Sequence, residues 1–134
     1  MIPKFRVWDK NNKYMEYTDK NLVVCISDEG ESAVDHTTFG HSCICMEDIE
    51  LMQSTGLKDI NGVEIYEGDI VEFKYPYDKR IKTKGIIVWN DNKACFGISM
   101  KETTEQYELY RITAENYLTV IGNVHQNPEL LEDN

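Results

Sequence analysis

Long apolar runs are missing from this chain of 134 residues. None approaches the roughly 18 to 20 residues that a membrane-spanning helix needs. The N-terminus, MIPKFRVWDK, also lacks the hydrophobic region that follows the basic residues of a secretory signal. The sequence therefore predicts neither a membrane protein nor a secreted one, and we expect a cytoplasmic protein.

Familiar catalytic motifs are absent as well. The sequence has no G-x-S-x-G, no G-x-x-x-x-G-K-[ST], no G-x-G-x-x-G and no H-E-x-x-H. Histidine, the side chain whose ordinary pKa lies near neutrality, occurs only at His36, His41 and His125. Acidic residues are so abundant that finding several of them near one another is little evidence for a catalytic site. We therefore predict a non-catalytic protein without a cofactor.

Positive charge is scarce and unevenly placed. Fourteen Lys and Arg face 24 Asp and Glu, which gives a net charge of -10 and disfavours general binding to nucleic acids or anionic membranes. The stretch 28–50 holds seven acids and no Lys or Arg, whereas 74–84 holds five cations and one acid. The simplest interpretation of 74–84 is a solvated hairpin tip. The alternative is a weak nucleic-acid site in which basic residues contact phosphates and aromatic residues stack on bases. Its candidate residues are Lys79, Arg80, Lys82, Lys84, Tyr75 and Tyr77.

The four cysteines are Cys25, Cys43, Cys45 and Cys95. Without a secretory signal the expected compartment is reducing, so we predict free thiols rather than disulfides. A zinc site built from His36, His41, Cys43 and Cys45 is the alternative, because zinc prefers His and Cys ligands. The spacing argues against it, since structural zinc sites usually use C-x2-4-C rather than C-x-C. We predict no metal.

Short strands separated by turn signals dominate the rest of the sequence. Strands are predicted at 4–9, 14–17, 21–27, 43–46, 49–54, 70–75, 84–89, 94–100, 107–110 and 119–124. The acidic stretch 28–38 has no hydrophobic period and is predicted to be a loop. Near the C-terminus, Asn127 and Pro128 predict the cap and first position of a short helix, with Leu130 or Leu131 packed inward.

These elements predict a mainly β fold in one domain, residues 1–134. Residues 57–134 would form a small SH3-like or barrel-like β core ending in the short helix. Residues 1–56 would form an N-terminal β extension that includes the acidic loop. A protein of this size has room for a hydrophobic core but not for a second full-sized domain.

Three segments carry a resemblance to a known family: KFRVWD at 4–9, QSTGLKDINGVEIYEGDIV at 53–71, and VIGNVHQNPELL at 120–131. In this order they are similar to the opening, the core motif and the ending of the YopX family of phage and prophage proteins. The resemblance implies a mainly β fold and an origin in a phage or prophage of a bacterial host. It implies no catalytic residue and no ligand.

The core motif itself has a physical interpretation. Gly56, Gly62 and Gly68 are expected at turns that need unusual backbone angles, and Asp59 and Asp69 can accept hydrogen bonds from nearby backbone amides. A fold signature explains these residues without chemistry. The alternative is a ligand contact on the loop that bears Asp59, Glu67 and Asp69.

The function predicted from these observations is a protein-interaction or structural module. Its acidic surface, with 28–50 as the nominated face, would steer toward a basic partner protein from the phage or the host. Exposed sheet edges make self-association into a homo-oligomer the secondary expectation. The alternative is weak, salt-sensitive nucleic-acid binding through the hairpin 74–84.

Overall fold

A computed structural model describes residues 4–17, 22–27, 30–35, 42–44, 49–74, 82–100 and 106–132. The chain divides into two compact units, Met1–Ser54 and Thr55–Asn134. Both are built mainly from β-strands, which confirms the predicted fold class. No helix among the described residues is long and apolar enough to cross a membrane.

The first unit begins with a hairpin of β1 (Phe5–Asp9) and β2 (Tyr14–Tyr17). Asp9 is buried and shapes the turn, because its Oδ1 accepts hydrogen bonds from the amides of Asn11 at 3.0 Å and Asn12 at 3.1 Å. The other side of β1 pairs with the first half of β6 (Ile49–Lys58), antiparallel. The strands predicted at 4–9, 14–17 and 49–54 are thus confirmed.

A second sheet of this unit contains β3 (Leu22–Ser27), β4 (Gly30–Asp35) and β5 (Ser42–Ile44), all antiparallel. The prediction that 28–38 is a loop was wrong, because 30–35 is the strand β4. Its sequence, GESAVD, has no clean alternation. Pairing with β3 along its whole length supplies the stabilisation that the pattern of β4 does not show.

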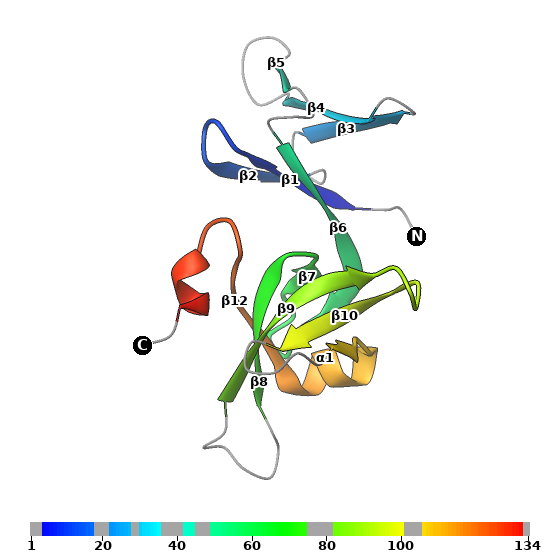
Figure 1. The fold of residues 1–134 in the computed structure, drawn as a ribbon, viewed down its shortest axis with the longest axis vertical. Helices are drawn as coiled ribbons and strands as arrows, with labels where there is room; N and C mark the ends of the chain where they lie inside the picture. The colour runs from blue at the N-terminus through cyan, green and yellow to red at the C-terminus, as the bar shows by residue number, and fades with distance from the viewer. Residues whose placement is uncertain are drawn as a thin grey trace. The chain divides into compact units, whose positions relative to one another are not determined.

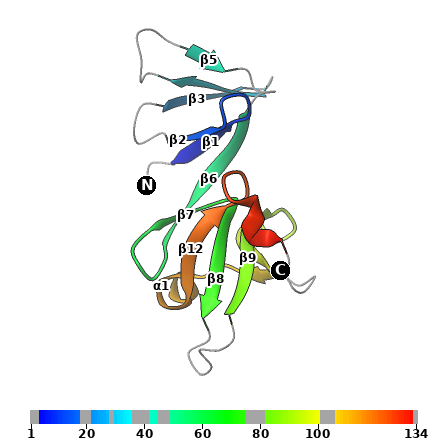
Figure 2. The same cartoon turned by 90° about the vertical axis from the view of Figure 1, so that its left-hand side faces the viewer.

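The second unit is built on one antiparallel sheet in the order β11-β10-β9-β8-β12. Its strands are β8 (Asp69–Lys74), β9 (Lys82–Asn90), β10 (Cys95–Met100), β11 (Gln106–Glu108) and β12 (Leu118–Asn123). Four strands follow each other as a meander and the fifth returns beside the first, so that β12, β8 and β9 lie side by side in Figure 2. This order agrees with the predicted SH3-like character.

The remaining elements are β7 (Glu64–Tyr66), α1 (Arg111–Tyr117) and a 3₁₀ helix, η2 (Pro128–Leu131). Helix α1 connects β11 to β12 and is drawn in orange in Figure 1. The sequence analysis did not predict it. The core of this unit consists of buried apolar side chains from β7, β8, β9, β10, α1 and β12: Ile65, Val71, Ile87, Ile98, Ala114 and Leu118.

The C-terminal helix is present as a 3₁₀ helix, with Asn127 at its N-cap position and Pro128 at its start, as predicted. The side chain of Asn127 makes no capping hydrogen bond to η2. It instead accepts a hydrogen bond from the amide of Asn123 at 3.2 Å, which closes the preceding turn. Leu130 and Leu131 are half-buried rather than fully packed inward.

Candidate functional site

Asp59, a predicted candidate for ligand contact, is a structural residue at the entrance of a turn. Its side chain is only 3% exposed. Oδ1 accepts hydrogen bonds from the amides of Asn61 and Val63, both at 2.9 Å, and Oδ2 accepts one from Val120 at 2.9 Å. The carboxylate therefore joins its own turn to β12, and both of its oxygens are used by the backbone.

The other residues of the core motif have similar roles. Asp69 is buried, and its Oδ2 accepts a hydrogen bond from the amide of Tyr66 at 2.7 Å. Glu67 lies half-buried in the turn between them. The φ angles of Gly56, Gly62 and Gly68 are 78°, 82° and 88°, as the motif predicted, although Gly56 lies within β6 rather than in a turn. These contacts favour the fold-signature interpretation.

The last of the three segments that resemble the family, 120–131, contains a closed turn around Asn123, which is 5% exposed. Its Oδ1 accepts hydrogen bonds from the amides of His125 at 3.1 Å and Gln126 at 2.9 Å. Gly122 lies so close to the side chain of Asn127 that a Cβ at position 122 would meet Oδ1 of Asn127 at 2.6 Å. This segment is therefore explained by backbone closure.

Most of the predicted nucleic-acid site lies outside the described residues, including Tyr75, Tyr77, Lys79 and Arg80. Lys82 begins β9. Lys84 is engaged within the molecule, because its Nζ donates a hydrogen bond to the carbonyl oxygen of Leu130 at 3.0 Å. Its ammonium group ties η2 to β9.

The predicted zinc alternative also falls mostly outside the described residues, which include neither His36, His41 nor Cys45; Cys43 lies in β5. In the described part of the chain no three or more His, Cys, Asp and Glu side chains gather to hold a metal. Cys95 is a half-buried free thiol.

A pocket of about 470 Å³ lies in the second unit and was not predicted from the sequence. Its apolar walls come from β8 and β10, and its polar walls come from β11, α1 and the turn after β9. The lining residues are Phe73, Lys93, Ile98, Met100, Gln106, Tyr107, Glu108, Tyr110 and Thr113. An apolar cavity with a few polar groups is the usual composition of a binding site.

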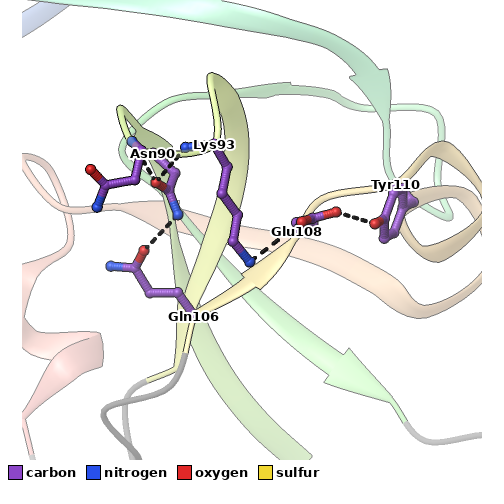
Figure 3. A network of polar contacts seen from close by, with 6 residues as sticks. Asn90, Lys93, Gln106, Glu108 and Tyr110 are labelled. Atoms are coloured by element: carbon purple, nitrogen blue, oxygen red, sulfur yellow. Dashed lines mark hydrogen bonds and ion pairs between the residues drawn. The ribbon is translucent and has the colours of Figure 1, made fainter.

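The polar side of this pocket is a connected network, shown in Figure 3. Glu108 is its centre: Oε1 lies 3.4 Å from Nζ of Lys93, and Oε2 accepts a hydrogen bond from the hydroxyl of Tyr110. Next to it, Nδ2 of Asn90 donates to Oε1 of Gln106 at 3.4 Å. The contacts join the turn after β9 to β11 and to the residue that precedes α1.

This network shifts two pKa values. The hydrogen bond from Tyr110, assisted by Lys93, lowers the pKa of Glu108. The same hydrogen bond and the negative charge of Glu108 raise the pKa of Tyr110. At neutral pH the carboxylate is therefore ionised and the phenol is protonated, so the site presents one negative charge balanced by one lysine.

Three large side chains are exposed between positions 107 and 112, and two of them, Tyr107 and Tyr110, line the pocket. Tyr107 is 52% exposed, Tyr110 is 58% exposed and Ile112 is 73% exposed. We call these three residues, which lie within one short segment of β11 and α1, the β11 patch. Exposed large side chains in the lining of a pocket, as Tyr107 and Tyr110 are, are a sign of an interaction surface.

Comparison with known proteins identifies the family of this chain. The family model described as YopX protein matches residues 4–132. The chain belongs to the YopX family. The match spans both compact units and includes all three segments that carried the resemblance.

Two solved structures are similar over nearly the whole chain. The crystal structure of protein EF1440 from Enterococcus faecalis has 28% sequence identity and a TM-score of 0.68, over 98% of this chain and 99% of that chain. The crystal structure of protein yopX from Bacillus subtilis has 25% identity and a TM-score of 0.69, over 98% and 97%. A search of curated proteins found no match. The YopX fold is thus shown.

Sequence reasoning missed the pocket because its walls are not local. Phe73, Ile98 and Thr113 come from three elements that are far apart in the chain. The one available signal was the pair of tyrosines that flank Glu108, at positions 107 and 110. In a strand the side chains at positions 107 and 110 would lie on opposite faces, so a half-buried strand would place only one of the two tyrosines in the core.

Proposed function

We propose that this YopX protein is a non-catalytic protein-interaction module of phage or prophage origin, working in the cytoplasm of its bacterial host. It binds its partner at the β11 patch and the adjoining pocket. The observation that carries this proposal is the pocket with an apolar floor and two exposed tyrosines on its rim. Tyrosine suits such a surface, because it offers a large apolar face and a polar tip at low entropic cost.

The electrostatics of the pocket support a binding role rather than a catalytic one. A general acid or base works best with a pKa near the working pH. The pKa of Glu108 is lowered instead, and that of Tyr110 is raised, so both move away from neutrality. The charged groups satisfy each other and leave no activated nucleophile among the described lining residues.

The nucleic-acid alternative receives no comparable support. The net charge is -10, and Lys84 already donates to the carbonyl of Leu130. A protein partner agrees better with an acidic chain whose exposed aromatic residues surround a pocket.

Capture of a partner from lysate of the encoding bacterium tests the proposal, with and without nuclease. The wild-type chain is expected to retain a stoichiometric protein that survives nuclease, and the double variant Tyr107→Ala, Tyr110→Ala should lose it. Val63→Ala is the matched control, because Val63 is 48% exposed but is not a lining residue of the pocket. The partner must then bind the purified chain with the same dependence on the tyrosines. Equal retention by the wild type and the double variant would contradict the proposal, and nuclease-sensitive retention would favour nucleic acid.

A further inference from the structure

The backbone N–H and C=O groups of β11 point in two opposite directions, toward β10 and away from it. The amide of Leu109 donates to the carbonyl of Phe96 at 3.0 Å, and the register pairs Glu108 with Gly97. In an antiparallel ladder, hydrogen-bonded residues alternate with residues whose N–H and C=O point away from the neighbouring strand. The N–H and C=O groups of Tyr107 and Leu109 therefore point at β10. The close approach of the Tyr107 carbonyl oxygen to β10 agrees with this, because a Cβ on Gly97 would meet that oxygen at 2.9 Å. It follows that the N–H and C=O groups of Gln106 and Glu108 point outward.

This outward side is an edge of the sheet among the described residues, since β11 ends the order β11-β10-β9-β8-β12. Side chains of paired residues share a face, so Tyr107 lies on the face of Ile98. Gln106 and Glu108 lie on the opposite face because successive side chains alternate. All four residues line the pocket, which therefore reaches both faces at the edge strand. An extended chain added at this edge would place its side chains on both faces in the same way.

Charge indicates what kind of chain would bind. The protein carries a net charge of -10. Glu108 is ionised, and its ion pair with Lys93 joins side chains that are 36% and 54% exposed. Exposed pairs of this kind contribute little, so an incoming cation can replace Lys93 at small cost. The site therefore favours a basic residue opposite Glu108.

We propose that β11 accepts an extended, basic segment of a partner protein as an added antiparallel strand. This inference rests on the proposed function and names the class of ligand. Outward groups of Gln106 and Glu108 supply the backbone hydrogen bonds, as in other complexes formed by strand addition. A Lys or Arg lies opposite Glu108, an aromatic or aliphatic residue lies opposite Tyr107, and a small polar residue lies opposite Gln106. Cross-strand pairs of opposite charge and of aromatic residues stabilise such pairing.

The probe for this proposal is the capped peptide Ac-Ser-Arg-Tyr-Thr-Ser-amide, titrated into the full chain and followed by amide chemical shifts in NMR. Antiparallel pairing places its Arg, Tyr and Thr opposite Glu108, Tyr107 and Gln106. The Arg and Thr amides then point at β11, whereas the Tyr amide points away. Methylation of the Arg or Thr nitrogen should weaken binding about tenfold, and methylation of the Tyr nitrogen should change it less than about twofold.

Two protein variants test the charge. Glu108→Gln should weaken binding of the probe about fivefold. Glu115→Gln removes the same charge from α1, outside the pocket lining, and should change binding less than about twofold. Equal effects of the two variants would overturn the assignment of the basic residue to Glu108.

Other outcomes also decide the question. Equal tolerance of methylation at all three positions would overturn strand addition. No shift at any of the β11 amides at about 1 mM peptide, a concentration that detects even weak binding, would overturn the inference. Concentration-dependent shifts of β11 without peptide would assign the edge to a second copy of the chain. The proposed function would survive these results if the lysate partner still depended on Tyr107 and Tyr110.

Discussion

Asp59 and Glu108 are both carboxylates of the second unit, and their surroundings differ in an instructive way. Asp59 is 3% exposed and accepts hydrogen bonds from three backbone amides. Glu108 lies at a rim, and among the described residues its carboxylate makes polar contacts with the side chains of Lys93 and Tyr110. The family motif contains the first residue and not the second. The motif therefore marks residues that hold this fold together, while the surface that we propose for a partner lies outside it.

The largest expected effect is on stability at Asp59. In Asp59→Asn, the amide NH₂ would face the N–H of Val120 or of Asn61 and Val63, because one side-chain oxygen cannot serve all three donors. We expect a loss of about 2 to 3 kcal/mol in the free energy of unfolding, measured by urea denaturation. Glu108→Gln should leave the free energy of unfolding nearly unchanged, because its ion pair and hydrogen bond lie at an exposed rim. Similar losses for both variants would break the distinction between the two carboxylates.

Gly68 offers the next largest effect. It has a φ of 88°, donates to the carbonyl of Ile87 at 2.8 Å and accepts from the amide of Val124 at 3.0 Å. Gly68→Ala should cost about 1 to 2 kcal/mol, because an L side chain is strained in this conformation. Ala94, with a φ of 51° in the turn beside Lys93, is the reverse case. Ala94→Gly should leave stability unchanged or raise it by up to about 1 kcal/mol, and thermal unfolding of both variants checks this pair.

Lys84 gives a smaller effect on the structural side of the comparison. Lys84→Met removes the hydrogen bond to the carbonyl of Leu130 and should cost about 1 kcal/mol. Hydrogen exchange at η2 should accelerate, since this contact ties the 3₁₀ helix to β9. Lys74→Met is the control, because Lys74 is exposed in β8. Unchanged exchange of the Leu130 and Leu131 amides in Lys84→Met would contradict a structural role for this lysine.

The smallest effect concerns titration at the rim. Tyr110→Phe removes the main cause that lowers the pKa of Glu108, so this pKa should rise toward its ordinary value. Because the folded pKa is the lower one, the wild type has a small stabilisation above the ordinary pKa of Glu that disappears as pH falls through the folded pKa. Tyr110→Phe should show a weaker pH dependence, because Lys93 still lowers the pKa of Glu108. NMR titration of the carboxyl carbon measures the shift, and Lys93→Met should produce a smaller one.

The strands of the fold could be predicted where pattern and turn chemistry agreed. In β8, which agrees with the strand predicted at 70–75, both Ile70 and Val71 are fully buried. Helix α1 could not be predicted, because its sequence RITAENY is short and Tyr110 at its N-cap makes no side-chain capping bond. It is stabilised by tertiary packing of Ala114, which is completely buried.

The candidate site was still less accessible to prediction. The turn bonds of Asp59 follow from local sequence, and the sequence analysis anticipated them. Its bond to Val120 joins residues that are 61 positions apart and needs the fold. The pocket depends on β8, β10, β11 and α1 together. The charge patterns at 28–50 and 74–84 pointed to segments whose side chains lie largely outside the described residues. The rim around Glu108 has nearly balanced charges, so no charge pattern in the sequence pointed to it.

The irregularity in β12 has a consequence for how the ends of this strand are specified. Val120 pairs with Val71 and Gly122 with Ile70, so Ile121 is an extra residue in the ladder. Before it, the phase of the strand is fixed by the bond from Val120 to Asp59; after it, the phase is fixed by the turn around Asn123. Ile121 therefore allows the Val120–Asp59 hydrogen bond and the turn around Asn123 to form in the same strand, although an unbroken ladder would place one of them out of register. Deleting Ile121 would restore the unbroken ladder and would break one of these two sets of hydrogen bonds.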